Sequence, residues 1–290
     1  MMLAKDCTVH DALRYGAERL ALRDDLRAYA ARDAQQILEI ATGLSRVQML
    51  AQPERRLSAE QVASYQGMLA QRRGAVPVQH LRGSQEFYGR EFFVTPDVLI
   101  PRPETEHLVE EVLRLYTDRT AAIRMADVGT GSGVLAITLA LAYPQAWVCA
   151  LDISDAALGV ARANAAALGC AERVRCVESD LMAAVAGDEA FDLIVSNPPY
   201  IPLTERDTLH AQVRDHEPHV ALFGGEDGHD VFRRLIPQAA QQLRPGGWLL
   251  LETAGRTALL DSMLAVWDGV HAVPDLQGIE RIVAARKPLQ

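Results

Sequence analysis

The chain has 290 residues with 29 basic and 38 acidic side chains, which gives a formal net charge of −9. Its apolar fraction of 49% is high enough to exclude an intrinsically disordered chain. The four cysteines are scattered without a CxxC pair, which excludes a small disulfide scaffold and predicts reduced thiols in a cytoplasmic protein. The excess of negative charge argues against a wide nucleic-acid-binding surface.

No segment has the pattern of a membrane span or an export signal. The longest apolar run, 134–143, has 10 residues, whereas a bilayer span needs about 20. The first twelve residues include Lys5, Asp6 and Asp11 and lack an apolar core, so no signal peptide is expected.

The first part of the chain, residues 1–76, is predicted to be a small all-helical domain of about four or five helices. One helical face carries apolar residues at i, i+3, i+4 and i+7: Ala34, Ile37, Leu38 and Ala41. Gly43 can end this helix, and Ser58 with Gln61 forms a capping box at the start of a later one. Because no motif here carries chemistry, we expect a packing or docking module.

Residues 77–100 are predicted to form a hairpin that connects this domain to the next. The segments 85–88 and 91–94 flank Gly89-Arg90. A glycine at the first central position of a two-residue turn predicts a type II′ turn.

The remaining residues, 101–290, alternate between expected strands and helices. Pro103 is expected at the start of a helix that buries an apolar stripe: Leu108, Val109, Val112, Leu113 and Tyr116. Strands are expected at 124–128, 147–151, 173–177, 191–196 and 248–252, and helices at 133–142, 155–168, 231–243 and 256–267. This alternation predicts an α/β fold with a mostly parallel sheet covered on both faces, whose ligands bind beyond the carboxyl ends of the strands.

A glycine-rich loop follows the first of these strands. Residues 127–133 read Asp-Val-Gly-Thr-Gly-Ser-Gly, and glycines let the backbone approach a ligand closely. The dinucleotide fingerprint is not met, because Val134 stands where its third glycine belongs, and no P-loop lysine follows. Similar turns occur in many α/β proteins, so this loop alone leaves the ligand open.

Two further strand ends carry acidic residues. Asp152 follows Gly129 by 23 residues and can accept hydrogen bonds from both ribose hydroxyls of an adenosyl ligand, or instead help to cap the helix after Ser154. Asp180 and Leu181 can meet the amino group and the ring of an adenine. An adenosyl group without pyrophosphate is therefore expected, and S-adenosylmethionine fits best.

The fourth strand ends in Asn197-Pro198-Pro199-Tyr200. The prolines stiffen the turn, although a purely structural Pro-Pro turn is the alternative. The side-chain carbonyl of Asn197 and the backbone carbonyl of Pro198 can accept both hydrogens of an NH2 group, and Tyr200 offers a flat face to a planar substrate. Alignment of an amide or exocyclic amine with a methyl donor predicts in-line methyl transfer.

These motifs together resemble those of Asn-Pro-Pro-Tyr methyltransferases that use S-adenosylmethionine and act on DNA adenine, RNA guanine or protein glutamine. Further segments resemble the bacterial peptide chain release factor N5-glutamine methyltransferases: 98–106, 217–218, 221–222, 224–228 and 243–247. The resemblance implies a Rossmann-like class I methyltransferase domain at 101–290 with a seven-stranded sheet. It also implies that the helical domain docks the release factor.

For the site, the resemblance implies that the cofactor is contacted by Gly129, Thr130, Gly131, Ser132, Gly133, Asp152, Leu181 and Asn197. Asn197, Pro198, Pro199 and Tyr200 would hold the glutamine amide of the Gly-Gly-Gln motif of class 1 release factors. The segment 101–106 would shape the methionine end of the site, with a salt bridge between domains as the alternative role of Arg102 and Glu106. Asp127 would orient the glycine loop or meet the methionine ammonium group through water.

Neither a metal nor a nucleic-acid substrate is expected. His210, His216 and His219 are interpreted as loop residues, because methyl transfer needs no metal. The alternatives left open are a ribosomal-protein glutamine methyltransferase, a methyltransferase of nucleic-acid adenine or guanine, and a non-catalytic or dinucleotide-dependent protein. The net charge and the scarcity of basic clusters (55–56, 72–73 and 233–234) argue against the second.

Overall fold

The computed structural model describes residue 3, residues 6–185, residue 187 and the ranges 190–275 and 277–289. The chain falls into two compact units. The helical unit consists of Met1–Gly83 with Leu209–His216, and the sheet unit consists of Ser84–Thr208 with Glu217–Gln290. The expected domain limits near residues 76 and 100 remain predictions.

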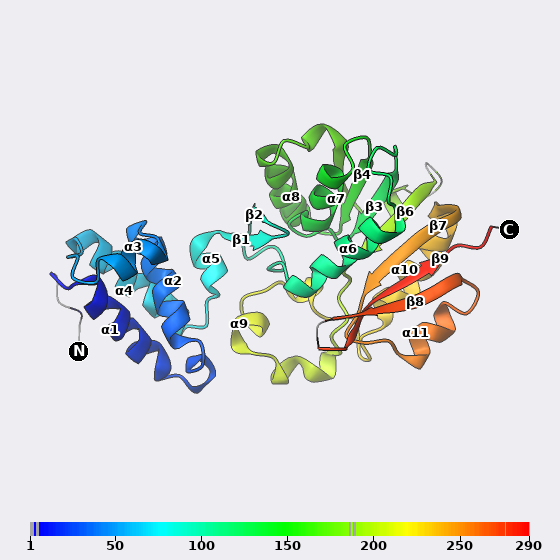
Figure 1. Cartoon of the computed structure of the whole chain (residues 1–290). Coiled ribbons are helices and arrows are strands. Elements are labelled where there is room, and N and C mark those ends of the chain that lie inside the picture. Colours follow the sequence, from blue (N-terminus) through cyan, green and yellow to red (C-terminus); the bar gives the residue numbers. More distant parts are fainter. Residues whose placement is uncertain (1–2, 4–5, 186, 188–189, 276, 290) are drawn as a thin grey trace. The chain divides into compact units, whose positions relative to one another are not determined.

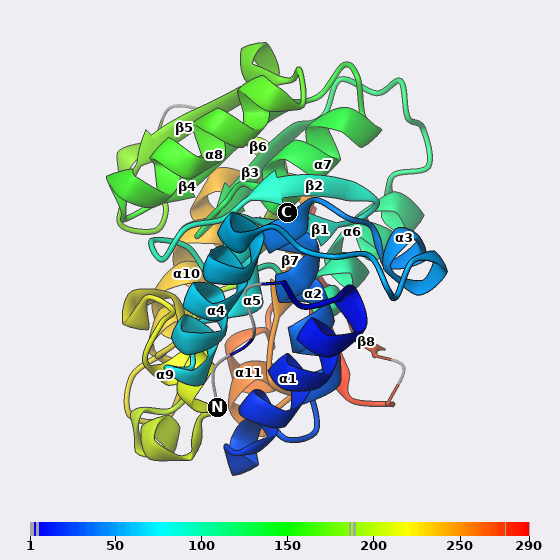
Figure 2. The same cartoon turned by 90° about the vertical axis from the view of Figure 1, so that its left-hand side faces the viewer.

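Most helices of the helical unit contribute side chains to one apolar core. Figure 2 shows how the ribbons of these helices are arranged. Its described helices are α1 (Val9–Ala21), α2 (Ala30–Thr42), α3 (Arg46–Ala51), α4 (Ala59–Arg73), α5 (Val78–Arg82) and α9 (Ala211–Arg214). The predicted face of α2 is buried at Ala34, Ile37 and Leu38, and Gly43 ends the helix with φ of 71°. The capping box at the start of α4 is also confirmed, because Ser58 and Gln61 each accept a backbone N–H from the other.

The hairpin of the sheet unit consists of β1 (Ser84–Phe87) and β2 (Arg90–Phe93). The predicted turn type was wrong. Phe87 pairs with Arg90, so the central turn residues are Tyr88 and Gly89, with φ of 50° and 73°, which is the pattern of a type I′ turn. The Glu106 carboxylate accepts a hydrogen bond from the Tyr88 N–H at 2.8 Å and helps to hold this unusual tyrosine conformation.

The sheet of this unit has seven described strands in the order β5-β4-β3-β6-β7-β9-β8 (Figure 1). The strands are β3 (Arg124–Val128), β4 (Trp147–Asp152), β5 (Val174–Glu178), β6 (Phe191–Ser196), β7 (Leu243–Glu252), β8 (Asp268–Pro274) and β9 (Glu280–Arg286). The five predicted strands are confirmed within one residue, except that β7 begins five residues earlier. β9 runs antiparallel to β7 and β8, and the sequence patterns placed neither β8 nor β9.

Helices cover both faces of the sheet. One apolar cluster packs α6 (Glu106–Leu115), α7 (Val134–Ala142) and α8 (Asp155–Ala167) against one face. A second cluster packs α10 (Asp230–Gln242) and α11 (Ala258–Met263) against the other. Two helix predictions need correction. Pro103 begins a separate 3-10 turn before α6, and the helix expected over 256–267 covers only Ala258–Met263, because β8 begins at Asp268.

The order of the strands reverses between β3 and β6. The chain runs outward from β3 through β4 to β5, and it then returns to β6 on the other side of β3. The Ser196 hydroxyl at the end of β6 donates a hydrogen bond to the Val128 carbonyl at the end of β3, at 2.6 Å. The loops after these two strands therefore leave the sheet side by side, where α/β sheets bind ligands.

A buried ion pair in the helical unit gives a stability prediction. Arg72 Nε lies 2.7 Å from Asp33 Oδ2, with side chains only 4% and 9% exposed. We expect Arg72→Met to lower the free energy of unfolding by about 3–5 kcal/mol, because the Asp33 carboxylate would remain buried without its partner. Urea denaturation followed by circular dichroism measures this change.

The matched control is Arg27→Met, which removes the partner of Asp24 from a pair that is 67% and 89% exposed. Its expected cost is below about 1 kcal/mol. Equal costs for the two variants would contradict the prediction.

Candidate active site

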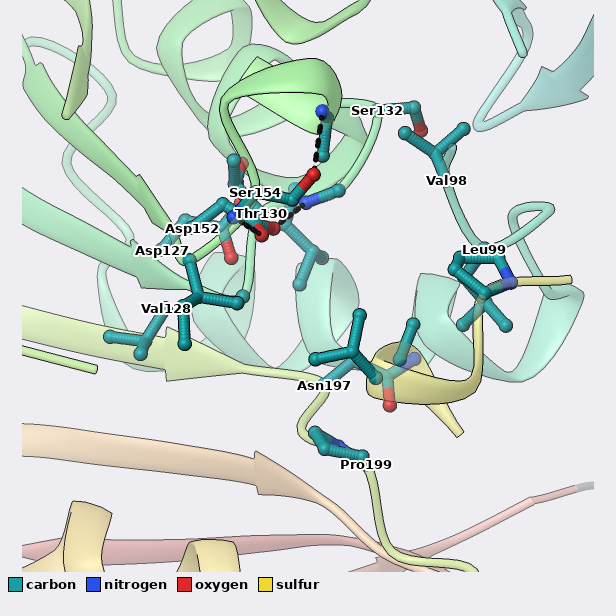
Figure 3. Close-up of a pocket in the computed structure, with 18 of the residues that line it drawn as sticks. Val98, Leu99, Asp127, Val128, Thr130, Ser132, Asp152, Ser154, Asn197 and Pro199 are labelled. Carbon is teal, nitrogen blue, oxygen red and sulfur yellow. Dashed lines mark hydrogen bonds between the residues drawn. The ribbon is translucent and has the colours of Figure 1, made fainter. Parts of the chain in front are cut away.

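A cavity of about 270 Å³ in the sheet unit lies where the loops after β3, β4, β5 and β6 converge. Figure 3 shows Asp127, Thr130, Asp152 and Ser154 grouped on one side of it, with Val98 and Leu99 on another and Asn197 with Pro199 on a third. Most of the sequence-predicted site residues line it: Gly129, Thr130, Gly131, Ser132, Asp152, Asp180, Leu181, Asn197 and Pro199. Gly133, Pro198 and Tyr200 lie beside the wall rather than in it.

The glycine loop is held by hydrogen bonds from its own backbone. The N–H groups of Gly129 and Thr130 both donate to the Leu151 carbonyl, at 2.8 and 2.9 Å. Gly131 donates its N–H to Asp152 Oδ2 at 2.9 Å and has φ of 54°, which an L side chain rarely adopts. The loop therefore presents backbone to the cavity, and Gly133 caps α7 behind it.

Asp152 contacts the start of α8, as one of the two roles that the sequence left open requires, and its role toward a ribose stays a prediction. Its Oδ2 accepts from Gly131 and its Oδ1 accepts from the Ser154 N–H at 3.0 Å, just before the Ser154 hydroxyl caps α8. Each carboxylate oxygen can accept a further hydrogen bond. Asp152 therefore fixes the loop and still offers acceptors to a ligand in the cavity.

Asp127 is the most deeply buried acid of the cavity wall, at 1% exposed. Its Oδ2 accepts hydrogen bonds from the Thr130 hydroxyl at 2.6 Å and the Ala136 N–H at 3.1 Å, which orients the loop as expected. Its Oδ1 is buried and has no partner among the described residues. Burial raises the pKa of Asp127 to about 7, against the lowering effect of those hydrogen bonds.

The loop after β5 supplies Asp180 and Leu181. Asp180 Oδ2 lies 2.5 Å from the guanidinium of Arg234, so one of its two oxygens is already paired. Leu181 has φ of 54°, a strained conformation for a leucine, and its loop is tied to β4 by a hydrogen bond from Ser179 N–H to the Asp152 carbonyl. Such strain often accompanies binding sites, and here it places the leucine at the cavity wall.

The Asn-Pro-Pro-Tyr segment is held by two contacts that the sequence did not predict. Asn197 Nδ2 donates to the Thr105 hydroxyl at 3.1 Å, and the Tyr200 hydroxyl donates to Glu252 Oε1 at 3.3 Å. Burial, at 1% exposed, raises the pKa of Glu252 to about 7, although Thr105 and Tyr200 lower it. Glu252 ends β7, so the rule that ligand sites lie at strand ends was the signal that could have found it.

The segment 222–230 packs directly behind the Asn-Pro-Pro-Tyr backbone. Ile201 N–H donates to the Leu222 carbonyl and Gly224 N–H donates to the Ile201 carbonyl, both at 3.0 Å. A Cβ atom on Gly224 would lie 2.5 Å from the Pro199 carbonyl oxygen. The glycines of this segment thus permit a close backbone approach that supports the Asn-Pro-Pro-Tyr turn.

Arg102 and Glu106 both form contacts within the sheet unit. Arg102 lines the cavity and lies 2.6 Å from Glu217 Oε1, while Glu217 Oε2 accepts from the Ile100 N–H at 3.1 Å. Burial raises the pKa of Glu217 despite the neighbouring Arg102. Glu106 binds the hairpin turn at Tyr88. These contacts anchor the segment 101–106 at the rim of the cavity.

The histidines after the Asn-Pro-Pro-Tyr segment have structural contacts. In the helical unit, His210 Nε2 lies 3.2 Å from the Asp25 carbonyl oxygen and His216 Nε2 lies 2.9 Å from that of Gly74. Among the described residues, no group of three or more His, Cys, Asp or Glu side chains is arranged to hold a metal ion. No helix in the described part of the chain is long and apolar enough to cross a membrane.

Comparisons with known proteins show what this chain is similar to. A family model described as "Methyltransferase small domain" matches residues 105–214, and another described as "PrmC N-terminal domain" matches residues 11–83. The chain is 46% identical to a protein named release factor glutamine methyltransferase from Koribacter versatilis, covering 88% of this chain and 90% of that one. It is 42% identical to a protein of the same name from Cereibacter sphaeroides, covering 96% and 98%.

The fold has a solved counterpart. The T. thermophilus 16S rRNA N2 G1207 methyltransferase, in complex with AdoMet and guanosine, matches with a TM-score of 0.52 at 22% identity, covering 70% of this chain and 49% of that one. This likeness concerns the fold alone. Together with the seven-stranded sheet, it confirms the expected class I methyltransferase fold.

Replacement of Gly224 tests the support of the Asn-Pro-Pro-Tyr turn. We expect Gly224→Ala to lower the free energy of unfolding by about 1–3 kcal/mol, because backbone oxygens of Pro199 and Gly228 lie within 2.6 Å of the new Cβ position. Urea denaturation measures the loss.

The control is Gly159→Ala in α8, where a Cβ would meet no atom within 4 Å. We expect that change to be neutral or to stabilise by up to about 1 kcal/mol. A Gly224→Ala protein as stable as the wild type would show that the close approach does not matter.

Proposed function

Because the chain belongs to the family of release factor glutamine methyltransferases, we propose that it methylates the side-chain amide nitrogen (N5) of the glutamine in the Gly-Gly-Gln motif of class 1 release factors. The observation that carries this proposal is the position of Asn197 and Pro199 in the wall of a cavity beside the glycine loop. This arrangement brings an amide-binding turn next to a site suited to a methyl donor.

S-adenosylmethionine is the methyl donor in this proposal, and the described residues fit it. Asp127 lines the cavity, and its buried Oδ1 has no partner among the described residues, so its carboxylate has acceptor capacity left for an ammonium group. Asp152 has acceptor capacity left for ribose hydroxyls, and Asp180 has one oxygen that Arg234 does not bind, which suits an adenine amino group. When bound, this cofactor supplies an electrophilic methyl group on sulfur.

The Asn-Pro-Pro-Tyr turn holds the substrate amide. Asn197 Oδ1 and the Pro198 backbone carbonyl accept the two N–H hydrogens, and the prolines keep these oxygens in place. An amide nitrogen is a poor nucleophile because its lone pair is delocalised. Fixing both hydrogens orients the nitrogen toward the methyl group, so alignment supplies much of the acceleration, and the proton then leaves to solvent.

The charge distribution supports a protein substrate rather than a nucleic acid. Of the basic residues that the sequence singled out, Arg72 is buried against Asp33, while Arg56, Arg233 and Arg234 form ion pairs with Asp6, Asp227 and Asp180. We propose that the helical unit docks the release factor and that the enzyme acts in the cytoplasm, where release factors function.

A direct assay tests the substrate. Purified enzyme with labelled S-adenosylmethionine should label a class 1 release factor and should fail to label a variant in which the glutamine of Gly-Gly-Gln is alanine. Asn197→Ala should abolish most labelling while the cofactor affinity, measured by calorimetry, falls much less. Labelling of total RNA, DNA or a ribosomal protein in place of the release factor would refute the proposal.

Cofactor affinity should depend on pH through Asp127. Its pKa is raised to about 7, so the folded protein without ligand binds a proton at Asp127 more tightly than the unfolded chain does. The resulting stabilisation of the fold is present below about pH 4 and is lost as the pH rises through 7. An ammonium group binds the ionised form, so S-adenosylmethionine should bind at least about fivefold more tightly at pH 7.5 than at pH 5.5.

Asp127→Asn should remove this pH dependence and weaken binding at pH 7.5. Glu252→Gln is the control, because Glu252 also has a pKa of about 7 but does not line the cavity. It should retain the pH dependence. An affinity that is independent of pH in the wild type would contradict the role of Asp127.

A further inference from the structure

Thr105 and Glu252 form a buried polar group behind the Asn-Pro-Pro-Tyr turn. Thr105 precedes α6 and is 3% exposed, and Glu252 ends β7 and is 1% exposed. Ser196 pairs with Leu251 in the parallel register of β6 with β7, so Asn197 and Glu252 leave the sheet at the same level. Residues from three distant parts of the chain therefore meet at this point.

In the hydrogen bonds of Thr105 and Glu252, the donors and acceptors follow a defined order. Glu252 accepts a hydrogen bond from Tyr200, and above its pKa of about 7 its ionised carboxylate can only accept hydrogen bonds. Asn197 Nδ2 donates to the Thr105 hydroxyl at 3.1 Å, so this hydroxyl acts as an acceptor toward Asn197. Its own hydrogen is then free to point toward Glu252, whose buried Oε2 has no hydrogen-bond partner among the described residues and whose pKa Thr105 lowers.

The carboxamide of Asn197 is thereby fixed in one of its two orientations. With Nδ2 turned to Thr105, Oδ1 is the remaining polar atom, and no described residue donates to it. We propose that Glu252 and Thr105 are positioning residues that keep Asn197 Oδ1 as the acceptor for the substrate and so select an amide over a carboxylate. This inference rests on the proposed function of the Asn-Pro-Pro-Tyr turn.

The chemical consequence is that the Asn-Pro-Pro-Tyr turn presents two acceptor oxygens to the substrate. Asn197 Oδ1 and the Pro198 carbonyl match the two hydrogens of a glutamine NH2 group. A glutamate side chain would bring a carboxylate oxygen against them and be repelled. If the carboxamide of Asn197 rotated by half a turn, Nδ2 would face the substrate as a donor in place of Oδ1. The discrimination between glutamine and glutamate would then fall.

The test compares Thr105→Val, which keeps the side-chain shape without the hydroxyl, with Thr105→Ser, which keeps the hydroxyl. We expect Thr105→Val to slow single-turnover methyl transfer to the release factor by about 5- to 20-fold, the effect of one lost buried hydrogen bond. It should also strengthen inhibition by a Gly-Gly-Glu release factor relative to binding of Gly-Gly-Gln. Thr105→Ser should retain most of the rate and the discrimination, and Glu252→Gln should resemble Thr105→Val.

A readout independent of activity separates this inference from the proposed function. In the NMR spectrum, the Asn197 side-chain NH2 protons should exchange slowly with water in the wild type and in Thr105→Ser, and faster in Thr105→Val. Unfolding curves and S-adenosylmethionine affinity should stay close to those of the wild type.

Equal exchange in all three proteins, or unchanged transfer and discrimination in Thr105→Val, would overturn the inference. So would a Thr105→Ser variant as impaired as Thr105→Val, because side-chain volume would then explain the effect. A wild-type enzyme that leaves the release factor unlabelled refutes the proposed function instead, and the exchange measurement still decides the role of Thr105.

Discussion

The site depends on the parallel pairing of β3 with β6 at the point where the strand order reverses. Parallel strands end at the same edge of a sheet. The hydrogen bond from Ser196 to the Val128 carbonyl holds the ends of β3 and β6 next to each other. The glycine loop and the Asn-Pro-Pro-Tyr turn start from these ends. A slip of one residue in this pairing would turn the buried side chains of β6 to the wrong face and separate the two loops.

Much of the polar chemistry at the site serves to hold backbone. Asp152 and Asp127 each bind the glycine loop with one or more oxygens before any ligand is considered. Loops are otherwise the most mobile part of a fold. The ligand-binding loops here are fixed by carboxylates from the strand ends, so a ligand meets groups that are already ordered, which lowers the entropy lost on binding.

The sequence predicted the elements that carry strong local signals. The strands of buried β-branched residues, the cap of α4 and the glycine end of α2 depend on neighbours within a few residues, and they form where expected. The hairpin turn, the short α11 and the strands β8 and β9 were missed because distant contacts decide them, as Glu106 does for Tyr88. Thr105 and Glu252 belong to the same class, since 147 positions of sequence separate them and only the folded sheet reveals their relation to Asn197.

The return of Leu209–His216 to the helical unit has a consequence for how this unit can be inherited or engineered. The chain enters that unit twice, so it is a discontinuous structural module rather than a detachable appendage. Removal of residues 1–83 would take away Asp25 and Gly74, whose carbonyl oxygens lie beside His210 and His216. The eight residues Leu209–His216 would then lack their packing partners. Recombination that exchanged only the first 83 residues between proteins would thus have to keep two separate sequence segments mutually compatible.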